Sequence, residues 1–191
     1  DVLLKVQPDL VLVHGDTTTS YVAALAALYQ KIPVGHVEAG LRTHDLYAPF
    51  PEEFNRKSVG LIAKWHFAPT ERAKQNLINE GYSSQNIYVT GNTAIDALKY
   101  TVENDYHHPL LDWVDKSRLI LITAHRRENL GEPMRQMFRA IKRMLDENQD
   151  IKAIYPVHLN PKVKSIADEI FGSSKQIKLV EPLHVIDFHN L

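Results

Sequence analysis

The stretch LVLVHGDTTTS, residues 10–20, decides the fold. Its apolar run over 10–14 follows the breakers Pro8 and Asp9 and predicts a buried strand. Gly15 allows a sharp turn after that strand, and the threonines at 17–19 can cap a helix over 17–30. A strand followed directly by such a helix is a βα unit, which is typical of a parallel sheet.

The same alternation of short apolar runs and longer amphipathic stretches continues along the chain. It predicts an α/β fold with two Rossmann-like domains whose parallel sheets face one another across a cleft. Residues 1–96 would be the C-terminal part of the first domain and 97–191 the N-terminal part of the second, because a polar, His-rich stretch interrupts the pattern near 104–109. Both domains would be incomplete, since both chain ends look like cuts in a longer protein. We expect further strands at 32–37, 65–68, 87–90, 119–123, 151–155 and 177–180, and helices at 51–63, 71–80, 94–100, 133–147 and 161–171.

Composition excludes several classes of function. The 22 Lys and Arg against 23 Asp and Glu give a net charge of −1, which argues against a nucleic-acid partner held by phosphate contacts. The absence of cysteine excludes disulfides and thiolate metal sites, and suits a reducing compartment such as the cytoplasm. The ten histidines are dispersed, so we expect no metal. No apolar stretch approaches the roughly 18 residues of a membrane helix, so we expect no membrane partner.

Polar residues follow the predicted strands, where open parallel sheets bind their ligands. Asp16 follows the first strand, and the bland alternative is that it only caps the next helix. Glu38 follows the second strand in a cramped setting, and a carboxylate there is costly unless it is paired. Arg42 could be its partner, but we favour a functional role.

The run PEEFNRK, 51–57, has a strong local explanation. Acids suit a helix N-terminus, and Glu52–Arg56 and Glu53–Lys57 are possible i,i+4 pairs. On local pattern alone, this run is a solvated helix start.

The second half places cations after its strands. His125, Arg126 and Arg127 precede a helix and suit a diphosphate, although Glu128 could make them a neutralised surface cluster. His158 follows the next strand and could equally be a buried, hydrogen-bonded histidine.

Seven motifs can then be considered together, and they span the chain. They closely resemble those of the bacterial non-hydrolysing UDP-N-acetylglucosamine 2-epimerases. The resemblance implies a cytoplasmic homodimer with the glycosyltransferase-B fold, acting on a nucleotide-sugar in cell-envelope polysaccharide synthesis without a cofactor. The motifs are VHGDTTTS (13–20), GHVEAGLRT (35–43), YAPFPEEFNR (47–56), VTGNTAIDAL (89–98), TAHRRENLGEP (123–133), YPVHLNP (155–161) and EPLHVIDF (181–188).

The resemblance also implies roles for single residues. Asp16, Glu38 and Glu52 match the family's catalytic acids. His125 matches a residue that contacts the UDP phosphates, and it belongs to the catalytic set together with the three acids. The substrate-binding set would be Asp16, Glu38, Arg56, His125, Leu183 and Phe188, with the last two beside the uracil. Glu52, Arg126 and His158 match an allosteric UDP-N-acetylglucosamine site of some relatives, which gives Glu52 two possible assignments.

The family's reaction, an isomerisation, interconverts UDP-N-acetylglucosamine and UDP-N-acetylmannosamine. It proceeds by elimination of UDP and its re-addition through a 2-acetamidoglucal intermediate. His44 departs from the family pattern, since glycine is more usual there. Segments that contact the nucleotide in the family are absent from this chain, so the resemblance does not imply that the fragment alone is active. A glycosyltransferase and a non-catalytic nucleotide-sugar sensor are the alternatives.

Overall fold

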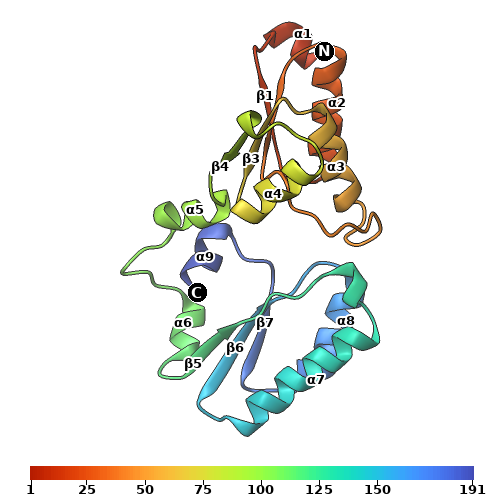
Figure 1. Cartoon of the computed structure of the whole chain (residues 1–191). Coiled ribbons are helices and arrows are strands. Elements are labelled where there is room, and N and C mark those ends of the chain that lie inside the picture. The colour runs from red at the N-terminus through yellow and green to blue at the C-terminus, as the bar shows by residue number, and fades with distance from the viewer. The chain divides into compact units, whose positions relative to one another are not determined.

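The computed structural model describes residues 1–191 apart from the side chain of Arg127. It divides the chain into two compact units, Asp1–Ile95 and Asp96–Leu191, each built on one parallel sheet (Figure 1). The predicted α/β class with two parallel sheets is therefore confirmed.

The first unit carries a four-stranded sheet with the order β1-β2-β3-β4. Its strands are β1 (Val11–His14), β2 (Val34–Val37), β3 (Trp65–Ala68) and β4 (Ile87–Val89). Its helices are α1 (Val2–Val6), α2 (Thr18–Tyr29), α3 (Glu52–Ile62) and α4 (Glu71–Asn79), with a short 3₁₀ turn, η1 (Ser84–Asn86). Helix α5 (Thr93–Thr101) runs from this unit into the next.

One face of the first sheet supplies the core of this unit. Val13 and Val34 pack with alanines of α2 and with Val59 of α3, while α4 covers the β3–β4 side through a separate cluster around Leu77. In Figure 1, α2, α3 and α4 lie on the same side of this sheet. On the opposite face, Leu12 and Tyr88 are exposed.

The second unit carries a three-stranded sheet with the order β5-β6-β7. Its strands are β5 (Arg118–Leu121), β6 (Ile151–Pro156) and β7 (Ile177–Val180). Its helices are α6 (Pro109–Val114), α7 (Glu132–Glu147), α8 (Pro161–Phe171) and α9 (Val185–Asn190), with a 3₁₀ turn, η2 (Arg127–Asn129).

Helices cover both faces of the second sheet. Ala153 and Tyr155 of β6 point into a core shared with α7 and α8, and Phe138 and Phe171 pack against Tyr155 there. Ile154 points the opposite way, toward α6 and the end of α9. This alternation along β6 is the period-two pattern of a strand buried on both sides.

Most predicted elements lie within one or two residues of their predicted bounds, but no bounds were predicted for α1, α6 and α9. None of the helices in the described part of the chain combines the length and apolar character that a membrane crossing requires.

Candidate functional site

Asp16 lies in the turn between β1 and α2, at the carboxyl edge of the first sheet. The helix cap is Thr17, whose hydroxyl accepts a hydrogen bond from the Ser20 amide at 3.2 Å, so the alternative that Asp16 caps the helix is wrong. The Asp16 carboxylate instead forms an ion pair with Arg56 of α3, and its backbone carbonyl accepts from the Asn55 side chain at 2.8 Å. Helix α3 therefore holds this turn through two neighbouring side chains.

Glu38 follows β2 and lies beside that turn. Its φ of 66° places it in the left-handed region, which is uncommon for a residue with a side chain. A Cβ built on Gly15 would lie 3.3 Å from Oε2 of Glu38, so the carboxylate packs over the glycine that precedes Asp16. Within the described part of the chain, the Glu38 carboxylate has no hydrogen-bond or ion-pair partner.

Arg42 is not the partner of Glu38, so the alternative of a Glu38–Arg42 pair is wrong. The Arg42 side chain is fully buried and forms a two-point ion pair with Glu80 just after α4, with Nε–Oε1 and Nη2–Oε2 distances of 2.8 Å each. A planar guanidinium matches a carboxylate in this geometry. The hydrogen bonds from Arg42 lower the pKa of Glu80, and the pair fixes the loop after β2 to the end of α4.

Glu53, in the first turn of α3, is fully buried. It accepts hydrogen bonds from the backbone amides of Thr43 at 3.2 Å and His44 at 3.1 Å, and from Nη1 of Arg56 at 3.2 Å. The expected solvated helix start is therefore wrong at Glu53, and the expected i,i+4 pairs are wrong because Arg56 pairs at i,i+3 and across to the β1–α2 turn. Glu52 is half-buried, and the described residues offer it no ion pair.

Two buried histidines lie beneath this edge of the sheet. His36 of β2 directs Nε2 at the Gly15 carbonyl at 2.8 Å, and since a carbonyl only accepts, Nε2 is the donor. Burial lowers the pKa of His36 to about 4, and burial with the nearby Arg42 charge lowers the pKa of His66 on β3 to about 4. Both rings are therefore neutral near pH 7. Each Nδ1 lacks a partner among the described residues.

In the second unit, His125 and His158 follow β5 and β6 and stack on one another. Their ring centroids are 5.2 Å apart with an angle of 12° between the planes. The backbone amide of Asn160 donates to Nδ1 of His158 at 3.0 Å, so the second ring is oriented by its own loop. His158 is exposed, so the alternative of a buried histidine is wrong.

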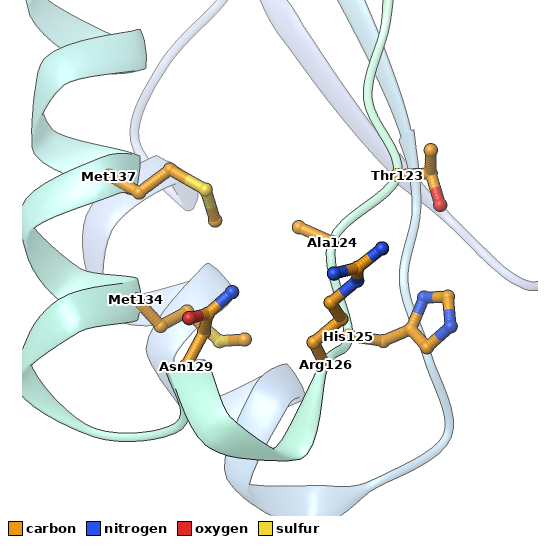
Figure 2. A pocket seen from close by; sticks show the side chains of 7 residues that line it. All are labelled: Thr123, Ala124, His125, Arg126, Asn129, Met134 and Met137. Atoms are coloured by element: carbon orange, nitrogen blue, oxygen red, sulfur yellow. The ribbon is translucent and has the colours of Figure 1, made fainter. Parts of the chain in front are cut away.

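A cavity of about 540 Å³ lies between the 123–126 loop and the start of α7. This volume falls in the range of small-molecule sites. Met134 and Met137 project from α7 toward the loop, and the His125 ring lies on the side of the loop away from α7 (Figure 2). The lining residues are Thr123, Ala124, His125, Arg126, Asn129, Met134 and Met137.

A hydrogen bond from the sheet fixes the position of the 123–126 loop. The buried Tyr155 hydroxyl donates to the Ala124 carbonyl at 2.6 Å, and burial raises the pKa of Tyr155 to about 12. The loop continues into η2, and α7 begins after it, at Glu132. Arg127 begins η2, and its side chain lies outside the described residues.

Leu183 lies just before α9 and Phe188 lies on it, and both follow the third strand of the second sheet. Leu183 packs on the cluster beneath α6, and Phe188 is half-buried. Hydrogen bonds tie α9 to the end of α5, His189 with Thr101 at 2.7 Å, and to the segment after α5, the Tyr106 hydroxyl to Asp187 at 2.5 Å. The hydrogen bond to Asp187 raises the pKa of Tyr106 to about 12.

The structure thus gathers Asp16, Glu38 and Arg56 at one sheet edge, and His125, Arg126 and His158 at another. The first group can exchange protons with a ligand and offers negative charge, while the second offers donors to an anion. Sequence reasoning missed Glu53, Asn55 and His36, although all three lie inside the quoted motifs. Among the described residues, no three acidic or histidine side chains gather as metal ligands would.

Comparison with known proteins gives full coverage of the chain. The family model described as UDP-N-acetylglucosamine 2-epimerase matches residues 1–191. The Bacillus subtilis (strain 168) UDP-N-acetylglucosamine 2-epimerase is 59% identical over 191 residues, which are 100% of this chain and 50% of the relative. The chain therefore spans about half the length of the curated relatives that it matches.

Solved structures agree in the fold. The S. aureus MnaA-UDP co-structure has a TM-score of 0.96 at 53% identity and covers 99% of this chain and 52% of that chain. The Neisseria meningitidis UDP-GlcNAc 2-epimerase bound to UDP-GlcNAc has a TM-score of 0.91 at 45% identity, covering 99% of this chain and 53% of that chain.

Proposed function

Because the chain belongs to the UDP-N-acetylglucosamine 2-epimerase family, we propose that the full-length protein interconverts UDP-N-acetylglucosamine and UDP-N-acetylmannosamine. The observation that carries the proposal is the cluster at the end of β1 and β2, where Asp16 is held by Arg56 and the Glu38 carboxylate lies beside it unpaired within the described residues.

The chemistry of the substrate dictates the route. The hydrogen on the second sugar carbon is not acidic, because no carbonyl adjoins that carbon. Cleavage of the bond between the anomeric carbon and the diphosphate oxygen sends both bonding electrons to UDP. The positive charge left on the ring makes the neighbouring proton removable, and its loss gives 2-acetamidoglucal. Protonation on the opposite face, followed by re-addition of UDP, gives the epimer without hydrolysis.

The acidic cluster supplies the proton transfers in this proposal. Asp16, Glu38 and Glu52 share the roles of base, acid and electrostatic stabiliser of the oxocarbenium-like centre. Arg56 is the supporting cation of the sugar site, since it already holds Asp16. Packing of Glu38 over Gly15 supports a site that is tight around the sugar.

The basic loop of the second unit supplies the anion contacts. His125 and Arg126 line the cavity after β5 and would stabilise the departing diphosphate. Leu183 and Phe188 would contact the uracil, since they follow β7, the third strand of the same sheet. The stacking of His125 with His158 also supports the second assignment, in which Glu52, Arg126 and His158 bind UDP-N-acetylglucosamine as an effector.

Solvent deuterium tests the proposal in the full-length protein. Turnover in heavy water should place one deuterium on the second sugar carbon of recovered substrate and product. A glycosyltransferase predicts no exchange and needs an acceptor, and a sensor predicts binding of UDP without product. The homodimer, the cytoplasmic location and the place in envelope polysaccharide synthesis stay predictions of the family resemblance.

Substitution of Asp16 tests the assignment of the acids. Asp16→Asn should lower turnover by at least about 10²-fold while UDP still binds, because the contacts to UDP are proposed for the other unit. Asp9→Asn, an exposed aspartate before β1, is the matched control and should keep wild-type turnover. Wild-type turnover by the Asp16 variant would contradict the assignment.

A further inference from the structure

Glu53 is a buried carboxylate for which the proposed reaction has no direct use. It is fully buried. Its carboxylate accepts hydrogen bonds from the backbone amides of Thr43 and His44 and from the side chain of Arg56, and not from the amides at the N-terminus of its own helix. A carboxylate that only complemented a helix dipole would remain at the solvated helix end. Burial of an unpaired carboxylate would be costly, so these bonds are what make its position tolerable.

Arg56 extends this set of contacts to the acidic cluster. Its Nη1 donates to Glu53 at 3.2 Å, and its Nη2 pairs with Asp16. Because the guanidinium is planar and rigid, fixing one nitrogen on Glu53 also fixes the direction in which the other meets Asp16. The Glu53 side chain is 0% exposed and the Asp16 side chain 24% exposed, so the connection runs from the protein interior to a carboxylate that a ligand can reach.

The second connection of Glu53 leads to the loop after β2. Oε1 accepts from the His44 amide and Oε2 from the Thr43 amide, so the carboxylate holds two successive peptide groups. That loop begins at Glu38, the other proposed acid. One buried group thus contacts both the support of Asp16 and the loop that carries Glu38.

We propose that Glu53 is the positioning residue of the acidic cluster: it sets the place of Asp16 through Arg56 and of the 38–44 loop through two peptide groups. Glu53 touches no reacting atom. The inference deepens the proposed function and rests on it for its kinetic consequences, while its structural consequences can be measured independently.

The variant Glu53→Gln tests the proposal in the full-length protein. Glutamine keeps the size of the side chain, but one of its two acceptor oxygens becomes an NH₂ group, which would point at an amide or guanidinium donor. The turnover number should fall by about 10²-fold, with KM for UDP-N-acetylglucosamine within about threefold, because misplacement of a reacting group by about 1 Å acts mainly on turnover.

A matched control separates this effect from a general helix effect. Glu71 is also in the first turn of a helix in the same unit, but it is exposed. Glu71→Gln should leave turnover and KM unchanged. If Glu53→Gln also stays within about twofold of wild-type turnover, the positioning role is excluded.

A double-mutant comparison tests the path through Arg56. If Glu53 acts on Asp16 through Arg56, adding Glu53→Gln to Arg56→Lys should lower turnover by much less than it does alone. A residue that merely stabilised the fold would lower both backgrounds equally, and that additive result would refute the proposed path.

A crystal structure of the full-length variant gives a readout that does not depend on activity. In Glu53→Gln, or in Glu53→Asp if the first variant does not fold, the Arg56–Asp16 pair and the 43–44 loop should shift by about 1 Å or more. If both stay in place, the proposal fails even where the wild type is an active epimerase. If the wild type exchanges no deuterium but the shift occurs, the proposed function fails and the positioning of Asp16 stands.

Discussion

Lowering the pH from 7.0 to 5.5 should destabilise the first unit through His36 and His66. Both imidazoles have a pKa of about 4 in the folded chain, against an ordinary value of about 6.5. Between these values the unfolded chain binds more protons than the folded chain, so stability falls as the pH falls. The loss begins near pH 6.5 and is complete near pH 4.

The magnitude follows from the two pKa values. For one histidine, the linkage relation gives a loss of about 1 kcal/mol in the free energy of unfolding between pH 7.0 and 5.5, and so about 2 kcal/mol for both. Carboxylates with ordinary pKa values contribute little to this interval, because those values lie near 4, below both pH values.

Urea unfolding of the chain, followed by tryptophan fluorescence, measures this loss. Trp113 lies in the second unit, so Trp113→Phe leaves Trp65 as a reporter of the first unit alone. In that background His66→Phe should remove about half of the pH dependence, because phenylalanine keeps a ring against Tyr82, 4.7 Å away between centroids, but cannot titrate. The same change at the exposed His107 should have no such effect.

Nuclear magnetic resonance gives the direct result that would refute the reasoning. If both buried imidazoles titrate near pH 6.5, their burial does not disfavour the charged form. The unfolding free energy would then change by less than about 0.5 kcal/mol between the two pH values.

Two further changes test how the loop after β2 is held, and urea unfolding measures both. Gly40→Ala should lower the free energy of unfolding by at least about 3 kcal/mol, because φ is 86° and the new Cβ would lie 2.2 Å from the Ala73 carbonyl oxygen. Gly91→Ala is the control: its φ is 82° but the space around it is open, so the loss should be only about 1 kcal/mol. Equal costs would contradict the close approach. Glu80→Gln should cost about 2 kcal/mol, since it leaves the buried Arg42 guanidinium against a neutral partner, and a loss below about 0.5 kcal/mol would contradict that burial.

Periodicity and cap chemistry predicted most of the fold. The helix at Pro161–Phe171 and the strand at Ile177–Val180 have their predicted bounds. The missed helices α6 and α9 are each six residues long, and histidines cap them: His108 accepts from the Leu110 amide, and His184 from an amide two residues on. Histidine is not a preferred cap, so the cap position gave neither helix a start signal, and Pro109 at the first position of α6 was too weak a signal alone.

The strand-end rule identified the two acids at the first sheet edge, but not the residues that hold them. The supports of Asp16 and the partner of Arg42 lie 38 to 40 residues away in the chain, beyond the reach of any local pattern. Glu53 was hidden for a different reason. An acid in a first helical turn already has a sufficient local explanation, and only tertiary packing reveals that this one is buried.

Glu38 differs from its neighbours in how it is held, and this difference bears on the chemistry. Asp16, Glu53 and Glu80 each have a guanidinium partner, whereas the described residues offer the Glu38 carboxylate none. Its backbone is held in the left-handed region, with φ of 66°, at a cost on the order of 1 kcal/mol. Two interactions on either side of the loop, the ion pair of Arg42 with Glu80 and the hydrogen bond from the Thr43 amide to Glu53, can offset that cost. Since Glu38 is half-buried and has no partner among the described residues, we expect a ligand to stabilise it more than it stabilises the other acids of this cluster.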